Sequence, residues 1–404
     1  MKLSWFGRLA LALFASLALG LGMTACGGGT IAYIWVLGQQ YNQIAAFKVD
    51  DYTGNLTQAP HQPFTSGGSN PVMLVVKTGG RYLYVLNQGT YDSATGNWDG
   101  AGIVEFSVGG DGSLTYEQTY QSVGSDSQWM QLDNSSSFLY ILDKYSPSGD
   151  GNGSITAFSI DATTGRLFLL DNETSIPPGQ KAINYWEVGG SPFMMKQEGG
   201  CLYTVNSADQ TITPYSVSGN GQLSPETTGT ITTPAKTITS INGSGNNIIL
   251  TDAGNNQIIP YTSGGSCQLS QLAGGIIDNI NGASDPTYSL ITTGGTNTYL
   301  YILNQQTTSI DQTAPFSSIS AFLLDPTHGL SPLNGTQIFP TGAGPVCMVE
   351  DPTNKYIYTS DHNAGTVTGK IFDPSTGQLS DLPRGSTFTA VGQAACMAIS
   401  GAID

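Results

Sequence analysis

Residues 71–114 read PVMLVVKTGGRYLYVLNQGTYDSATGNWDGAGIVEFSVGGDGSL and contain one complete structural unit. An apolar run from Pro71 is followed by a Gly-Gly turn, an alternating run that ends on Asn87, and a second alternating run over 103–108. A turn rich in glycine then leads into a fourth run. Alternating β-branched and aromatic residues between glycine and aspartate turns are typical of strand–turn–strand segments. The stretch therefore predicts four antiparallel strands in about 50 residues.

The same unit recurs along the chain, with a second strand that ends on Asn or Asp and a third strand that leads into a turn of one style. The strand ends are Asn87, Asp143, Asn206, Asp252, Asn304 and Asp361, and the turns read GGDGSL, DATTGRL, SGNGQL, GGSCQL, DPTHGL and DPSTGQL. A further unit with the turn DDYTGNL opens the chain without a leading strand, whereas residues 394–400 look like a leading strand without a unit. Closure of a ring by the two chain ends explains both observations and removes exposed strand edges. We predict an all-β fold, a seven-bladed β-propeller of four-stranded antiparallel blades over residues 31–404, closed by pairing of the N- and C-terminal strands.

Residues 1–25 have the pattern of an export signal, with Lys2 and Arg8 ahead of an apolar run over 9–21 that is short for a membrane span. The segment ends in small residues before Cys26 and resembles a bacterial lipobox, although Met23 stands where leucine is usual. Lipid on Cys26 would anchor the protein to the membrane, with residues 26–30 as a short tether. The alternative is an ordinary secretory signal in which Cys26 is incidental. Both interpretations predict export, to the periplasmic or extracellular face.

The composition excludes several classes of partner. The sequence has 13 Lys and Arg against 29 Asp and Glu, which gives a net charge of −16 at pH 7. An acidic surface argues against nucleic acid and against anionic lipid headgroups. Only 10% of the residues are charged and 52 are glycine, as expected of an extracytoplasmic all-β protein with many turns. No zinc-type or EF-hand spacing is present, and we expect no cofactor and no metal.

The units Y-x-Y-V-x-N and I-x-x-F-x-V-D-x-x-T-G-x-L resemble those of the lactonase-type seven-bladed propellers, which include 6-phosphogluconolactonases, and the looser YVTN repeats. In that family a leading strand carries Gly-x-x-Pro-Arg-His and a nearby second strand ends Asn-Glu. The resemblance implies that Arg, His and Glu are the catalytic groups. Here the best match is Gly190-Ser191-Pro192-Phe193-Met194 with Val205-Asn206-Ser207, in which Phe193, Met194 and Ser207 stand at the three catalytic positions. Opening a lactone needs a base for water and a cation or donors for the oxyanion, and these side chains supply neither base nor cation.

The position that matches the histidine of the family is mostly apolar in the other units as well. It reads Met73, Trp129, Met194, Tyr288, Cys347 and Cys396, while the alignment of residues 234–240 is ambiguous. Two interpretations stay open. The ring could be packing between blades, or Trp129 and Tyr288 could form a stacking platform for a sugar or another flat ligand.

Three long polar connections, after Asn87, Asp143 and Asn304, are expected on the face where the leading strands enter the channel. Binding candidates on this face are Asn87, Asn206, Asn304 and Lys144, together with the ring residues Trp129, Met194 and Tyr288. A small polar ligand or an envelope protein would fit such a face, but long loops are also tolerated as plain insertions. A phosphorylated sugar is not expected, because the sequence shows neither an Arg fork at the mouth nor a glycine-rich helix start.

Four cysteines remain beyond Cys26. Cys347 and Cys396 occupy equivalent positions on neighbouring leading strands, so they are either bridged, pinning the closing blade, or too far apart to bond. Cys201 in a strand and Cys267 in a turn are expected to be unpaired.

Two functions of different class follow from the sequence. The first is a non-catalytic ligand-binding, partner-binding or scaffold propeller of the cell envelope, because the Arg, His and Glu of the family are replaced. The second is an active lactone hydrolase that uses relocated groups, for which His362, Asp361 and Asp143 are the candidates. His362 follows a strand end on the mouth face, although a lone histidine is more often a surface residue than a base.

Overall fold

The computed structural model describes residues 29–173, 182–307 and 316–401, so the predicted signal and Cys26 lie outside the described residues. Strands dominate the described part. Its helices are three short 3-10 turns, η1 (Gln39–Tyr41), η2 (Thr227–Gly229) and η3 (Gly265–Cys267). None of the helices in these ranges is long and apolar enough to cross a membrane.

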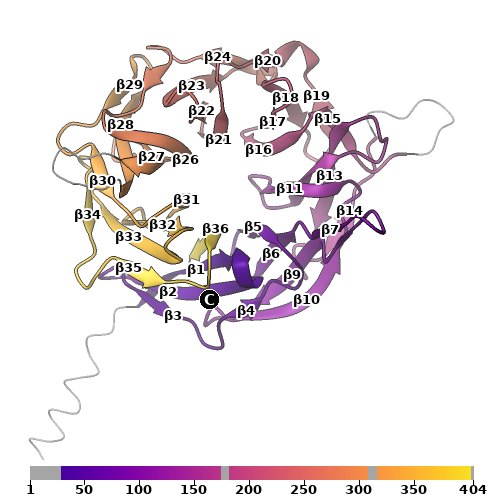
Figure 1. Ribbon diagram of the computed structural model, residues 1–404, viewed down its shortest axis with the longest axis horizontal. Coiled ribbons are helices and arrows are strands. Elements are labelled where there is room, and N and C mark those ends of the chain that lie inside the picture. Colours follow the sequence, from indigo (N-terminus) through magenta and orange to yellow (C-terminus); the bar gives the residue numbers. More distant parts are fainter. Residues whose placement is uncertain (1–28, 174–181, 308–315, 402–404) are drawn as a thin grey trace, which may run out of the picture.

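Seven antiparallel sheets stand around a central axis as the blades of a propeller, which confirms the predicted fold class (Figure 1). Each blade runs from an innermost leading strand outward. Blades 2 to 4 contain β5 (Pro71–Val76), β6 (Tyr82–Asn87), β9 (Gly102–Val108) and β10 (Leu114–Tyr120); β11 (Ser125–Leu132), β12 (Phe138–Tyr145), β13 (Asn152–Ile160) and β14 (Leu167–Leu169); β16 (Pro192–Glu198), β17 (Cys201–Asn206), β18 (Thr211–Val217) and β19 (Leu223–Pro225). Blades 5 to 7 contain β21 (Ile238–Ser244), β22 (Asn247–Asp252), β23 (Gln257–Ser263) and β24 (Leu269–Gln271); β26 (Ala283–Gly294), β27 (Asn297–Thr307), β28 (Phe316–Asp325) and β29 (Gly329–Pro332); β31 (Pro345–Glu350), β32 (Tyr356–Asp361), β33 (Thr366–Phe372) and β34 (Leu379–Asp381).

Blade 1 combines both ends of the described chain. Its strands from the axis outward are β36 (Ala394–Gly401), β1 (Thr30–Gly38), β2 (Gln43–Asp50) and β3 (Leu56–Gln58). β36 pairs antiparallel with β1, with Gly401 opposite Ala32 and Ala394 opposite Gly38. The yellow β36 accordingly lies beside the indigo β1 in Figure 1. The predicted closure of the ring is therefore confirmed.

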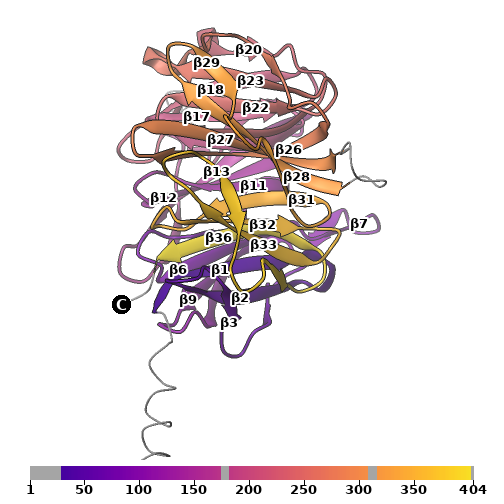
Figure 2. The ribbon, with the colours of Figure 1, turned by 90° about the vertical axis from the view of Figure 1, so that its left-hand side faces the viewer.

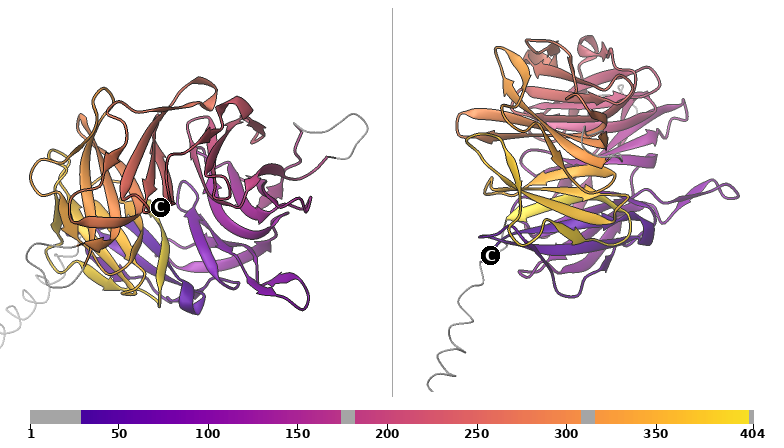
Figure 3. Two further views of the ribbon diagram at one scale, coloured as in Figure 1. Left: turned by 45° about the horizontal axis from the view of Figure 1, so that its top comes forward. Right: turned by 60° about the vertical axis from the view of Figure 1, so that its left-hand side comes forward.

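Short strands complete the rim of the ring. A fifth strand pairs with the third strand of every blade except blade 2, where the longer β10 follows β9 instead. These strands are β4 (Phe64–Thr65), β15 (Trp186–Gly190), β20 (Ile231–Thr232), β25 (Ile277–Asp278), β30 (Ile338–Pro340) and β35 (Thr387–Thr389). In blade 2, the connection after Asn87 forms a hairpin of β7 (Thr90–Asp92) and β8 (Asn97–Asp99). β7 reaches the edge of the molecule in Figure 2, and the two views of Figure 3 show the flat, disc-like ring from other sides.

Both faces of a blade are buried, which explains the low content of charged residues. Along β6, Leu83 and Val85 pack with blade 1, whereas Tyr84 and Leu86 pack with blade 3. Successive side chains of a strand point to opposite faces, so apolar runs rather than strict alternation suit these strands.

One contact between neighbouring blades recurs around the ring and accounts for two of the repeated motifs. The Y-x-Y motif lies on the second strand, and the glycine of the T-G-x-L turn belongs to the next blade. Tyr84 Oη donates to the carbonyl oxygen of Gly165 at 2.5 Å, and Tyr358 Oη of blade 7 donates to Gly54 of blade 1 at 2.6 Å. A Cβ on Gly165 would lie 2.4 Å from the ring of Tyr82, the first aromatic residue of the motif. Glycine is therefore needed for this close approach, and its φ of +69° to +74° at Gly54 and Gly165 favours it as well.

Candidate functional site

A bulge near the start of each leading strand shapes the mouth of the channel. In β5 the register shifts between Pro71 and Met73, and the same shift recurs in the leading strands of blades 3 to 7. In blade 5 it falls between Ile238 and Ser240, which places Ser240 at the position that was ambiguous in the sequence. In blades 2, 6 and 7 two consecutive residues at this bulge line the mouth, as in the pair Val72 and Met73.

The cavity at this mouth has a volume of about 260 Å³, and we call it the channel-mouth cavity. Its walls are mostly apolar and come from blades 1, 2, 3, 4, 6 and 7. The lining residues are Gln39, Val72, Met73, Trp129, Met194, Thr287, Tyr288, Val346, Cys347, His362, Ala395 and Cys396. The structure thus brings the predicted ring residues together around one small cavity.

Trp129 and Tyr288 are the two aromatic residues in the lining of the channel-mouth cavity. The indole Nε1 of Trp129 is buried and has no hydrogen-bond partner among the described residues. Burial raises the pKa of the Tyr288 hydroxyl well above its ordinary value, so this hydroxyl stays protonated, and it is hydrogen-bonded to the side chains of Cys347 and Asn242. A mostly apolar wall with aromatic residues is typical of sites for small molecules.

His362 borders the same cavity, as predicted from its place after a strand end. Its backbone N–H donates to the carbonyl oxygen of Gly344 at 2.8 Å, which fixes the chain where it leaves β32. Among the residues that line the channel-mouth cavity, His362 carries the imidazole and none carries a carboxylate. A general base in this cavity would therefore have to be His362.

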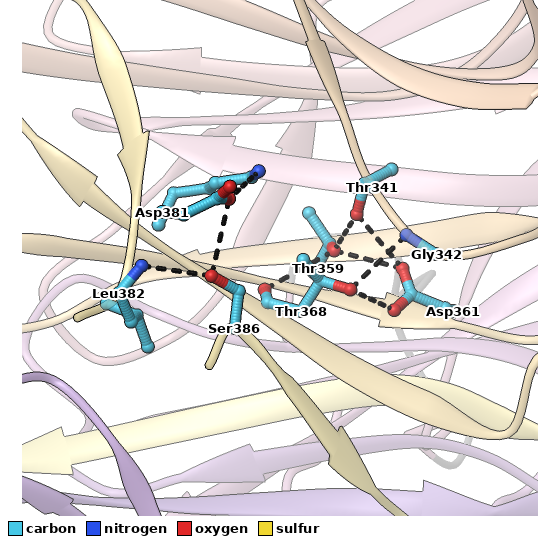
Figure 4. Close-up of polar contacts among 9 residues, drawn as sticks. Thr341, Gly342, Thr359, Asp361, Thr368, Asp381, Leu382 and Ser386 are labelled. Atoms are coloured by element: carbon cyan, nitrogen blue, oxygen red, sulfur yellow. Dashed lines mark hydrogen bonds and ion pairs between the residues drawn. The ribbon is translucent and has the colours of Figure 1, made fainter. Parts of the chain in front are cut away.

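Asp361, the neighbouring candidate, is fully buried and fully used by the fold. Burial raises the pKa of its carboxyl group, and four threonine hydroxyls that donate to it work in the opposite direction. Figure 4 shows three of these donors around the carboxylate. The hydroxyls and their distances to the carboxylate oxygens are Thr341 (3.2 Å), Thr359 (3.0 Å), Thr366 (3.0 Å) and Thr368 (2.7 Å). No face of Asp361 is left for a substrate, and the residue holds strands and linker together.

Asp143 has the same structural role in blade 3. It is 0% exposed and accepts hydrogen bonds from the hydroxyls of Ser122, Ser127 and Thr156. β12 continues past Asp143 to Tyr145, so the predicted strand end is wrong here. A Cβ on Gly124 of the linker would lie 2.5 Å from the Asp143 Cβ, so the linker passes directly over Asp143. Burial raises the pKa of Asp143 to about 6, and the three hydroxyls limit that rise.

The raised pKa of Asp143 predicts a measurable pH dependence of stability. The folded pKa lies above the unfolded one, so the contribution is fully present below about pH 4 and is lost as the pH rises through about 6. Asparagine occupies the equivalent positions of three other blades, so Asp143→Asn is expected to fold. The difference in unfolding free energy between pH 4.5 and pH 8 should become smaller by about 2 kcal/mol in this variant. Urea unfolding of both proteins at the two pH values measures this, and an unchanged difference would contradict the assignment.

Asn87, Asn206 and Asn304, which the sequence offered as binding residues, are also fully buried. Asn87 and Asn206 end their strands, whereas β27 continues past Asn304 to Thr307, so the predicted strand end is wrong there. Asn87 Nδ2 donates to the carbonyl oxygen of Ser66 in the preceding linker at 3.1 Å. Asn206 Nδ2 donates to two threonine hydroxyls of β18, and Asn304 Nδ2 donates to Ser320 at 2.8 Å. Like Asp143 and Asp361, these side chains fasten the blades internally and do not face the channel-mouth cavity.

Lys144 lies on the rim and is engaged with protein groups. Its Nζ is 3.6 Å from a carboxylate oxygen of Asp126 and 5.3 Å from the centre of the Tyr145 ring. Gln88 Nε2 donates to the other oxygen of Asp126 at 2.6 Å. The lysine is partly exposed, so this ion pair adds little to stability.

Two of the three positions that match the family's catalytic groups, Phe193 and Ser207, lie at a separate cavity of about 310 Å³ between blades 4 and 5, whereas the third, Met194, lines the channel-mouth cavity. Phe193, Asn206 and Ser207 line the separate cavity, and so does Lys236, which sequence reasoning missed because the 234–240 alignment was ambiguous. This cavity therefore has a cation but no Asp, Glu or His among its lining residues. A cation without a base can hold an anion but cannot activate water.

The cysteines differ from expectation in one pair. Cys201 and Cys267, predicted to be unpaired, form a disulfide between blades 4 and 5 with a Cα–Cα distance of 5.5 Å. Cys201 stands where other blades carry the first aromatic residue of the Y-x-Y motif, and Cys267 stands where they carry the turn glycine. The disulfide thus replaces the recurring contact between blades at this point. The sulfurs of Cys347 and Cys396 are 4.0 Å apart and do not form a disulfide.

Comparisons with known proteins agree with this architecture. A family model described as "Lactonase, 7-bladed beta-propeller" matches residues 89–273. Among solved structures, a candidate 6-phosphogluconolactonase of Bacteroides fragilis is similar with a TM-score of 0.65 and 17% identity, over 92% of this chain and 98% of the other. A periplasmic gluconolactonase of Pseudomonas aeruginosa is similar with a TM-score of 0.63 and 16% identity, over 92% and 99% of the two chains. None of the curated proteins matches the sequence.

The family match and the seven blades confirm the resemblance of this chain to lactonase-type seven-bladed propellers. At identities of 16% and 17% the similarity to the solved structures concerns the fold alone.

Proposed function

We propose that this lactonase-type seven-bladed propeller is a non-catalytic binding protein of the cell envelope, which holds a small ligand or a partner protein at its channel mouth. The proposal includes export and a lipid anchor on Cys26, on the strength of the sequence pattern of residues 1–26. An envelope location fits the acidic composition and the disulfide between Cys201 and Cys267, because disulfides persist in oxidising compartments.

The observation that carries the proposal is that neither cavity combines a base with a cation. The cavity between blades 4 and 5 offers Lys236 with Phe193 and Ser207, and its lining residues include no base. The channel-mouth cavity offers His362, and its lining residues include no cation. Asp143 and Asp361 are fully buried, and their carboxylates accept hydrogen bonds from serine and threonine hydroxyls. Attack of water on a lactone needs both functions on one carbonyl group, because the base must reach the water while the oxyanion is stabilised.

The channel-mouth cavity is the better binding site of the two. Its mostly apolar walls, with the aromatic side chains of Trp129 and Tyr288 among the lining residues, suit a small flat ligand. The alternative function, an active lactone hydrolase, is favoured by a single observation, the position of His362 in the wall of this cavity.

An assay of lactone hydrolysis separates the two functions. We expect no turnover above the uncatalysed rate on gluconolactone, on its 6-phosphate or on an uncharged aliphatic lactone. Turnover that is lost in His362→Ala but kept in His328→Ala, a change at an exposed turn on the opposite rim, would establish the hydrolase and overturn the proposal. Because a trace of contaminating esterase could mimic activity, the His328→Ala protein from the same purification serves as the matched control.

A further inference from the structure

Two free cysteines face each other in the wall of the channel-mouth cavity, and we call them the thiol pair. Cys347 lies on β31 of blade 7 and Cys396 on β36 of blade 1, at equivalent positions after the bulge. The Cys347 thiol donates to the Cys396 sulfur over 4.0 Å, and both residues line the cavity. This hydrogen bond lowers the pKa of Cys396, and it raises the pKa of Cys347. The N–H of Met397 also donates to the Cys347 sulfur at 3.3 Å, which stabilises negative charge there.

The surroundings of the thiol pair are soft and apolar. Cys396 packs against β5 of blade 2, where Met73 occupies the equivalent position and lines the same cavity. On the side of blade 6 the thiol pair meets Tyr288. Within the described residues no group of three or more His, Cys, Asp and Glu could hold a metal ion. The four-ligand set that zinc prefers is therefore not formed here.

We propose that the thiol pair binds one soft monovalent metal ion of the Cu(I) class at the channel mouth. Thiolate ligands select Cu(I) over hard cations, and the cavity wall supplies the two thiols, while the Met73 sulfur accepts the N–H of Met130 at 3.4 Å. Metal–thiolate bonds of about 2.3 Å can span up to about 4.6 Å between two sulfurs, so the observed 4.0 Å is compatible with one bridging ion. The site lies at the cavity, so the ion has a path to it.

Binding exchanges protons for the ion and transfers no electrons. Each thiol loses its proton to solvent, two metal–sulfur bonds form, and the positive charge of the ion offsets one of the two thiolate charges. The competing fate of the thiol pair is a disulfide. That reaction needs an oxidant to accept two electrons and must bring the sulfurs to about 2.05 Å.

The test uses the purified full chain, with Cu(I) delivered anaerobically in competition with bicinchoninate. We expect one high-affinity equivalent of Cu(I) per chain. Cys347→Ser and Cys396→Ser should each weaken binding at least about 100-fold, because each removes one of two thiolates. Ser240→Ala, a change at the equivalent position of blade 5, is the control and should bind as the unaltered chain does. X-ray absorption of the Cu(I) protein should show sulfur neighbours.

Two outcomes would overturn the proposal. One is a Cu(I) affinity that persists in the double variant Cys347→Ser, Cys396→Ser, which would place the ion elsewhere. The other is a disulfide between the two cysteines in the protein purified from its exported form, detected by peptide mapping without reductant. Lactone hydrolysis is measured separately, so failure here does not bear on the proposed binding function.

Discussion

A chain that stops before Ala394 is expected to lose its cooperative fold. The truncation removes β36, which supplies the innermost strand of blade 1. Ala394 and Met397 belong to the core between blades 7 and 1, and Ala398 belongs to the core between blades 1 and 2. The loss uncovers an edge of β1 and two cores together, and it should exceed the 5–15 kcal/mol by which domains are usually stable. Soluble yield and thermal unfolding measure the effect.

A permuted chain provides the matched control for this truncation. Gly401 lies opposite Ala32 in the antiparallel pair, so a short turn can join the end of β36 to the start of β1. In this variant the chain begins at β36 and ends after β35. It therefore keeps every strand but closes the ring between blades 7 and 1 by side-chain packing alone. It should fold with reduced stability, whereas the truncated chain should aggregate through its exposed edge. A soluble truncated chain with a sharp unfolding transition would show that closure by β36 is dispensable.

The number and order of the blades could be predicted from the sequence because each unit carries its own local signals. Turns such as DPSTGQL and strand ends such as Asn87 are read from adjacent residues. The missing leading strand at one end and the surplus strand at the other follow from simple counting. The ring of apolar residues around the mouth was also predictable, since equivalent positions of a repeat point to the same place in a propeller.

The roles of the strand-end residues could not be predicted in the same way. Asp361 ends β32 and Asp143 lies near the end of β12, and nothing in the sequence shows that hydroxyl groups from neighbouring strands and linkers enclose them. Their burial depends on the linker passing over them, with Gly342 and Gly124 as the residues that allow contact. Lys236 was missed for a related reason, because it lies just before β21, and that strand could be aligned only once the bulge at Ser240 was known.

The disulfide between Cys201 and Cys267 gives the second large effect. Replacing both cysteines by serine should destabilise the protein by about 4 kcal/mol, because the bond closes a loop with a sequence separation of 66 and restricts the unfolded chain. The double variant avoids a leftover thiol. Chemical unfolding of the oxidised protein and of the variant measures the difference.

The position of this disulfide in the repeat suggests a rescue. Other blades place an aromatic ring where Cys201 stands and glycine where Cys267 stands, as in the pair Tyr82 and Gly165. Cys267 has a positive φ of 57°, which favours glycine over serine. The variant Cys201→Tyr, Cys267→Gly should therefore recover part of the stability that the serine pair loses. Equal stabilities of the two double variants would mean that the covalent bond, and not the contact between blades, accounts for the effect; a serine pair as stable as the oxidised protein would contradict the prediction.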